Sequence, residues 1–95
     1  MGGYVYIIAN RKYGALYTGV TADISQRIVQ HRDRTGSRHA KKYDIYQLVY
    51  VEFHEDISAA IVREKAIKKW RRAWKIALIE RANPDWRDLF FDLNC

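Results

Sequence analysis

The sequence has 95 residues, of which 48% are hydrophobic and 14% aromatic, and it carries a formal net charge of +6. This length predicts a single domain, residues 1–95, because domains typically have ~100–150 residues and shorter chains barely bury one core. The longest apolar run, Tyr4–Ala9, is far shorter than the ~20 residues of a membrane span, and no secretory signal pattern precedes it, so we expect a cytoplasmic protein without membrane contact. The single cysteine, Cys95, excludes an internal disulfide and a cysteine metal cluster.

The first part of the chain predicts a β-hairpin followed by a helix. Tyr4–Ala9 and Ala15–Gly19 are short runs rich in β-branched and aromatic residues. The polar loop between them contains a glycine, which is typical of a hairpin. Thr21 and Asp23 are both suitable N-caps for a helix that runs to about Thr35, where a glycine follows.

The second part predicts a third strand and three further helices. Gln47–Phe53 has the composition of a strand, and a long helical pattern follows it. The apolar stripe of this pattern drifts in phase after Trp70, so we expect two successive helices, roughly Ile57–Lys69 and Arg72–Arg81. Asn83–Pro84 joins a capping residue to a proline suited to the first helical position, which predicts a short terminal helix. The predicted order of elements is ββαβααα, an α+β arrangement.

The positive charge is concentrated in two segments. Residues 32–42 hold five basic residues and one acidic residue, and residues 63–75 hold seven and one, so their net charges are +4 and +6 while the whole chain carries +6. Such local charge suits a polyphosphate backbone, although lysine and arginine also solvate ordinary helix faces. The residues predicted to contact a nucleic acid are Arg32, Arg34, Arg38, Lys41, Lys42, Lys65, Lys68, Lys69, Arg71 and Arg72.

Glu64 is a carboxylate on an apolar helix face. At ~100° per residue, its direction falls between those of Ile57 and Ile61, so the side chain lies within the apolar stripe. Burial of an unpaired charge costs free energy, and two arrangements would offset this cost. Glu64 either pairs with Lys68 one turn later, or lies beside a cleft and holds a hard divalent cation.

Four other residues have the chemistry of a phosphate site. Arg27 and His31 are four residues apart, so they share one face of the predicted helix, where arginine could bind phosphate oxygens and histidine could move a proton. Tyr6 and Tyr17 lie on the two strands of the predicted hairpin. The alternative interpretation is a solvated helix border and two strand tyrosines that pack a sheet face and expose their hydroxyls.

These residues come in the order and approximate spacing of a known family. The sequence resembles the GIY-YIG nuclease domain over nearly its whole length, and it looks similar to the small stand-alone bacterial members. The matching residues are, in order, Tyr4-Val5-Tyr6, Tyr17-Thr18-Gly19, Arg27, His31, Glu64 and Asn83. The resemblance implies a central three-stranded antiparallel sheet flanked by helices, which agrees with the elements predicted above.

The resemblance also implies a role for the matching residues. The family cleaves phosphodiester bonds with a divalent metal, so Glu64 would hold Mg²⁺ or Mn²⁺. Tyr6 would be the general base, and Tyr17 would help to orient water or phosphate. A free tyrosine has a pKa of ~10, so this role needs nearby positive charge, which Arg27 and the metal could supply. Arg27 would also stabilise the negative charge of the transition state.

Two further residues match the family, and the sequence departs from the family pattern in three respects. His31 would assist proton transfer or phosphate binding, and Asn83 would support the site. Tyr4 and Thr18 stand where the family name has glycine and isoleucine. The lysine that many members carry soon after the second motif is absent, and His31 could take its place.

The resemblance leads to two hypotheses about function. The first is a metal-dependent endonuclease acting on DNA, including branched or damaged DNA, because so small a domain has little surface for reading a long sequence. RNA stays open as the polymer, and a protein partner could supply specificity. The second is a nucleic-acid-binding module of the same fold with little or no catalytic activity.

Overall fold

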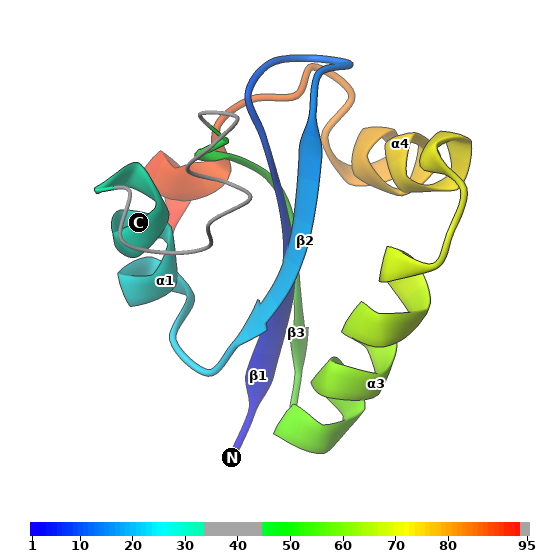
Figure 1. Cartoon of the computed structure of the whole chain (residues 1–95). Coiled ribbons are helices and arrows are strands. Elements are labelled where there is room, and N and C mark those ends of the chain that lie inside the picture. Colours follow the sequence, from blue (N-terminus) through cyan, green and yellow to red (C-terminus); the bar gives the residue numbers. More distant parts are fainter. Residues whose placement is uncertain (34–44, 94–95) are drawn as a thin grey trace.

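The computed structural model describes residues 1–33 and 45–93. Their sheet has three strands, β1 (Gly3–Ala9), β2 (Leu16–Thr21) and β3 (Gln47–His54), in the order β2-β1-β3 (Figure 1). Both strand pairs are antiparallel, and β1 is the most buried strand because it has a neighbour on each side. This confirms the predicted three-stranded antiparallel sheet and leaves β2 and β3 as its edges.

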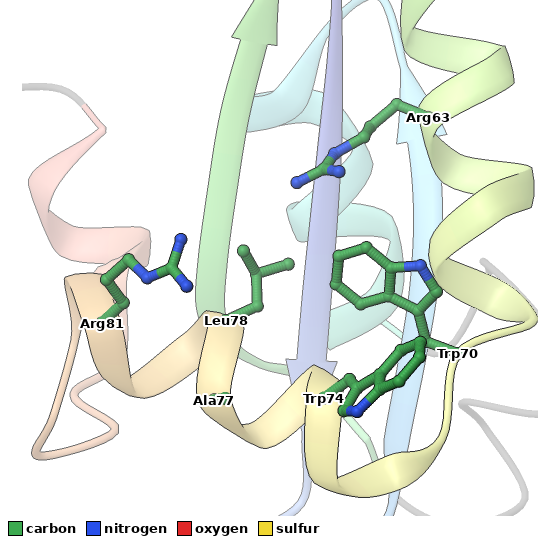
Figure 2. Close-up of a pocket in the computed structure, with 6 residues that line it drawn as sticks. All are labelled: Arg63, Trp70, Trp74, Ala77, Leu78 and Arg81. Carbon is green, nitrogen blue, oxygen red and sulfur yellow. The ribbon is translucent and has the colours of Figure 1, made fainter.

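The structure describes three α-helices, which cover the two faces of the sheet. Helix α1 (Ile24–Arg32) lies on one face, and α3 (Ile57–Lys68) and α4 (Arg72–Ala82) lie on the other (Figure 1). Asp23 and Asp56 begin α1 and α3 by accepting hydrogen bonds from backbone N–H groups of the first turn. A cavity of about 360 Å³ lies between α3 and α4 (Figure 2), and we call it the α3–α4 cavity. None of the described helices has the length and apolar character needed to cross a membrane.

Helix α1 ends earlier than the sequence predicts. Its last residue is Arg32 and its C-cap is Asp33, whose backbone N–H bonds to carbonyls of the preceding turn. The residues of the predictions that lie outside the described part of the chain are Thr35, Arg34, Arg38, Lys41 and Lys42.

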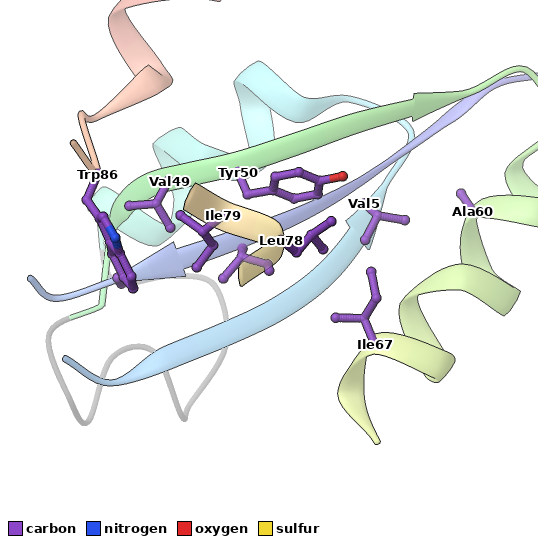
Figure 3. Close-up of a cluster of buried hydrophobic side chains, with 10 residues drawn as sticks. Val5, Val49, Tyr50, Ala60, Ile67, Leu78, Ile79 and Trp86 are labelled. Atoms are coloured by element: carbon purple, nitrogen blue, oxygen red, sulfur yellow. The ribbon is translucent and has the colours of Figure 1, made fainter. Parts of the chain in front are cut away.

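Alternating side chains on β1 divide the core into two clusters. Val5, Ile7 and Ala9 face α3 and α4 and pack there against helix residues such as Ile67 and Ile79 (Figure 3). The other members of this cluster are Val49, Tyr50, Ala60, Leu78 and Trp86. The residues that face α1 instead form a second cluster, which contains Tyr6, Ile8, Ile24, Ile28, Ile45 and Leu48. The two faces of one narrow sheet therefore carry separate cores.

The predicted terminal helix at Asn83–Pro84 is wrong. Asn83 is the C-cap of α4, the next two residues form a turn, and Trp86 has a backbone φ of 56°, which a right-handed helix does not allow. The element that follows is a 3₁₀ helix, η1 (Leu89–Asp92). The reason is tertiary, because the Asn83 side chain is used to join α4 to β3 rather than to begin a helix.

Replacement of Asn83 by alanine should lower the free energy of unfolding by about 2–4 kcal/mol, because each buried polar group left without a partner costs about 1–3 kcal/mol. The Asn83 Nδ2 donates to Val49 O at 3.0 Å and to Arg87 O at 2.9 Å, and its Oδ1 accepts from Arg87 N at 3.1 Å. Urea unfolding measures the loss. Gln26→Ala removes an exposed amide and serves as the control; equal losses in the two variants would contradict the structural role of Asn83.

Candidate active site

A glycine on the edge strand allows the Tyr6 ring to reach the edge of the sheet. Tyr6 on β1 is paired with Gly19 on β2. A Cβ atom placed on Gly19 would lie 2.4 Å from both Cζ and Oη of Tyr6, so a side chain at this position would displace the ring. Glycine in a strand often marks such a close approach. The Tyr6 hydroxyl therefore lies over β2, on the face that α1 covers.

Helix α1 brings two side chains to the Tyr6 hydroxyl. Arg27 Nε donates a hydrogen bond to Tyr6 Oη at 3.3 Å, and His31 Nε2 lies 2.9 Å from the same oxygen. One helical turn separates the two residues, so they point in the same direction. The ring of Tyr17 completes the cluster, with its centroid 6.4 Å from that of Tyr6 and 5.5 Å from that of His31.

Glu64 approaches the same sheet edge from the opposite face. Its helix, α3, packs on the face away from Tyr6. Burial is the main cause of the raised pKa of Tyr6, and the negative charge of Glu64 adds a small effect in the same direction. Glu64 is 8% exposed, and its Oε2 lies 2.9 Å from Nζ of Lys68. That Nζ is in turn 5.8 Å from the centroid of the Tyr17 ring. The structure therefore contains the predicted ion pair, and it also has the carboxylate near the tyrosines.

Burial controls the protonation states in this cluster. Burial raises the pKa of Tyr6 above its usual value and outweighs the hydrogen bond from Arg27, which lowers it. Burial also lowers the pKa of His31 to about 4, and the positive charge of Arg27 adds to that effect. The hydrogen bond to Tyr6 raises the pKa of Arg27. At neutral pH, Tyr6 is protonated, His31 is neutral and Arg27 is charged.

The positive charge of Arg27 alone does not favour the phenolate of Tyr6, because burial raises the pKa of that hydroxyl by more than Arg27 lowers it. The expected contribution of a metal to the phenolate stays a prediction. The neutral His31 offers another route for the proton, because Nε2 accepts the hydrogen of the Tyr6 hydroxyl when it carries no proton of its own. The cluster is thus a hydrogen-bonded chain from Arg27 through Tyr6 to His31.

Asn83 and Arg32, a predicted site residue and a predicted nucleic-acid-binding residue, have bonding partners away from the Tyr6 cluster. Asn83 is bonded to backbone groups of β3 and of the segment after α4, and it lies on the face covered by α3 and α4. Arg32 forms an ion pair with Asp88, and its guanidinium lies 4.3 Å from the centroid of the Phe90 ring. Asn83 thus joins the C-terminal segment to β3, and Arg32 joins it to α1.

The basic residues of α3 and α4 differ in how they are engaged. Lys65 and Lys69 are exposed, and neither forms an ion pair with a residue that the structure describes. Lys68 pairs with Glu64, and Arg71 lies 4.9 Å from the centroid of the Trp74 ring. Arg72 is bonded through Nη2 to two backbone carbonyls of the β1–β2 loop. Among the predicted nucleic-acid-binding residues of these two helices, Lys65 and Lys69 therefore have the most available charge, and both lie in the last part of α3 or directly after it.

The sequence predicts Gly19 only as part of the tyrosine motif and gives it no place in the site. The structure gives it one, since the Tyr6 ring occupies the space that a side chain would fill. A glycine inside a strand run, opposite an aromatic residue on the neighbouring strand, is the pattern that could have predicted this contact.

Comparisons with known proteins identify the family of the chain. The family model described as the GIY-YIG catalytic domain matches residues 2–77. A UPF0213 protein of Staphylococcus saprophyticus is 41% identical over 76 residues, which are 80% of this chain and 92% of that protein. A UPF0213 protein of Staphylococcus aureus is 36% identical over 77 residues, 81% of this chain and 93% of that protein. The chain therefore belongs to the GIY-YIG nuclease family.

A solved structure supports the same conclusion. The solution NMR structure of a UPF0213 protein from Bacillus halodurans is 27% identical and superposes with a TM-score of 0.58, covering 93% of each chain. The predicted family and fold class are both confirmed. Nucleases of this family generally depend on a divalent metal and act on nucleic acids.

The pKa of His31 predicts a loss of stability in acid. Burial keeps the pKa of His31 at about 4 in the folded protein, against 6.5 for an ordinary histidine. Below about pH 6.5 the unfolded chain therefore binds a proton that the folded protein does not, so the free energy of unfolding decreases as the pH falls toward 4. Between about pH 7 and about pH 4.5 this should cost about 2 kcal/mol.

His31→Gln removes the titrating group and keeps a polar side chain, so it isolates this effect from the carboxylates that both proteins share. Urea unfolding of both proteins at the two pH values gives the comparison. If the two proteins lose equal stability over this range, His31 does not titrate as the structure requires.

Proposed function

We propose that this protein is a divalent-metal-dependent endonuclease that hydrolyses phosphodiester bonds in DNA, with branched or damaged DNA among its substrates. The observation that carries the proposal is the arrangement at the edge of β2. Tyr6, Arg27 and His31 are joined by hydrogen bonds there, and the charge of Glu64 acts on the same hydroxyl. Membership of the GIY-YIG family supports the reaction class.

The residues present fit a divalent cation. The described residues contain no group of three or more histidine, cysteine, aspartate or glutamate side chains that could hold a metal ion. Mg²⁺ is nevertheless usually held by one or two carboxylates together with water and substrate phosphate, and Glu64 offers a nearly buried carboxylate. When bound there, Mg²⁺ or Mn²⁺ would polarise a phosphoryl oxygen and neutralise charge on it. Lys68, which is half exposed, would yield or share the Glu64 carboxylate.

The hydrogen-bonded chain provides a path for the proton of the attacking water. Tyr6 Oη takes that proton while its own proton passes to His31 Nε2, so the tyrosine need not exist as a free phenolate. The neutral state of His31 leaves it able to accept. The negative charge of a bound phosphate offsets the repulsion between Arg27 and the resulting imidazolium.

The remaining members of the cluster act on the phosphate. Arg27 has a raised pKa and stays charged, so its guanidinium can stabilise the additional negative charge of the transition state. Tyr17 lies beside both His31 and Lys68 and is placed to orient the phosphate or the water. Lys65, Lys69 and Arg71 are exposed near the end of α3 and would bind the backbone of the polymer.

Two observations favour a second candidate function, a nucleic-acid-binding module with little hydrolytic activity. Burial raises the pKa of Tyr6, which makes its proton harder to remove, and the Glu64 carboxylate already has an ion-pair partner in Lys68. Both functions require the same fold and the same basic surface. A change at Glu64 separates them.

Glu64→Gln should reduce metal-dependent cleavage by at least about 100-fold and leave DNA binding nearly unchanged. The amide preserves the size of the side chain and can still accept a hydrogen bond from Lys68, but it removes the negative charge that would hold the cation. The assay measures cleavage of single-stranded, duplex, flap and junction DNAs with Mg²⁺ or Mn²⁺. Binding is measured separately in chelator, and a thermal melt checks the fold.

Glu55→Gln serves as the matched control because Glu55 is an exposed carboxylate just before α3. Cleavage by Glu64→Gln at the rate of the parent would remove the assignment of Glu64 to the metal. If the parent cleaves none of these DNAs, nor the corresponding RNAs, the binding module becomes the better description of the protein.

A further inference from the structure

The α3–α4 cavity combines aromatic and cationic walls. Its floor is formed by Ala77 and Leu78, and Trp70 and Trp74 stand beside each other where α3 passes into α4 (Figure 2). Arg63 and Arg81 approach from the other sides. The volume of about 360 Å³ is near the lower end for ligand sites, which suits one small planar group.

The two tryptophans offer ring surface for stacking. Their centroids are 6.2 Å apart and their planes meet at 80°, so they form a corner rather than a stacked pair. Trp74 is 50% exposed, an unusual state for so large an apolar side chain. Trp70 is held in place by the Arg63 guanidinium, which lies 5.1 Å from its ring centroid. One ring is thus fixed, and the other, which has the Arg71 guanidinium 4.9 Å from its centroid, is still half exposed to a ligand.

The two arginines play different parts. Arg63 Nε is 3.0 Å from Glu52 Oε2, so its charge is already balanced. Arg81 is exposed and forms no ion pair with any residue in the described ranges 1–33 and 45–93. An available guanidinium beside aromatic surface selects a ligand that is both planar and anionic, and it disfavours a cationic one.

The cavity is a neighbour of the candidate active site along one helix. Arg63 and Glu64 are consecutive on α3 and differ in direction by about 100°, so one lines the cavity while the other faces the edge of β2. Trp70 follows Lys68 by two residues. A nucleic acid strand with a phosphate near Glu64 would reach the cavity by running past the end of α3.

We infer that the α3–α4 cavity binds one unpaired nucleotide of the substrate strand, with its base stacked on Trp74 against Trp70 and its phosphate on Arg81. This inference rests on the proposed function, because it takes the strand to be the nuclease substrate. Stacking of a base on an aromatic side chain tolerates any sequence but requires that the base be free of its partner. The protein would therefore prefer DNA that contains unpaired nucleotides.

Binding is measured in chelator, where the proposed hydrolysis cannot occur, with a fluorescein-labelled oligothymidylate of about 10 nucleotides and a blunt duplex of the same length. Trp74→Ala should weaken oligothymidylate binding by about 5- to 100-fold and change duplex binding by less than about twofold. Arg81→Gln should lower the salt dependence of oligothymidylate binding by about 0.7 in slope. Both side chains are exposed, so a thermal melt should show the fold intact.

The matched controls are Phe53→Ala and Arg11→Gln. Phe53 is 58% exposed and packs on Tyr4, which lies on the sheet face that α1 covers, away from the cavity. Arg11 is exposed in the β1–β2 loop. Neither control should change oligothymidylate binding. Unchanged binding by Trp74→Ala would overturn the inference, as would equal losses for oligothymidylate and duplex.

Thymidine 5′-monophosphate tests whether the ligand is a strand or a free nucleotide. We expect it to bind much more weakly than the oligothymidylate, because it lacks the neighbouring phosphates; equal affinity would overturn the assignment to a strand. If the parent cleaves no DNA but its oligothymidylate binding depends on Trp74, this inference is supported and only the catalytic proposal is removed. If Trp74→Ala cleaves DNA at the parent rate and binds oligothymidylate as the parent does, this inference is overturned and the catalytic proposal stands.

Discussion

The contact between Tyr6 and Gly19 is the constraint on which the candidate site depends. A fully buried tyrosine on the central strand can bring its hydroxyl to the sheet edge only because the edge strand has no side chain at the paired position. Arg27 and His31 then bind the hydroxyl from α1, which ties the two strands and the helix together at one oxygen atom. The same burial affects the chemistry, since it raises the pKa of Tyr6 and lowers that of His31 to about 4.

The narrow sheet explains how residues from opposite faces can act together. β2 is an edge strand, so side chains from α1 on one face and from α3 on the other can approach the same site past this single strand. Helix α3 carries Glu64 toward this edge and turns Arg63 toward the α3–α4 cavity. One helix thus connects the proposed centre for hydrolysis with the proposed pocket for an unpaired nucleotide, and a wider sheet would separate them.

Local patterns in the sequence predicted most of the fold. The three strands and the division between α3 and α4 near Trp70 follow from composition and periodicity within short windows, and Asp23 was one of two candidate N-caps for α1. The prediction that a terminal helix begins at Asn83–Pro84 was wrong because the Asn83 side chain bonds to β3, a contact that no local pattern contains. Family resemblance supplied the members of the cluster, and the structure adds how they are connected. The direction of the Tyr6 pKa shift could not be predicted, because it depends on how deeply the hydroxyl is buried once all elements have packed.

The most direct test of this account is the rate of single-turnover DNA cleavage by Tyr6→Phe, with saturating protein and Mg²⁺. The substitution keeps the ring over Gly19 and removes only the hydroxyl that joins Arg27 to His31. If that hydroxyl carries the proton of the attacking water, the rate should fall by about 100- to 10,000-fold, the usual contribution of general acid–base catalysis, while DNA binding stays near that of the parent. Cleavage by Tyr6→Phe within a few-fold of the parent rate would contradict the account.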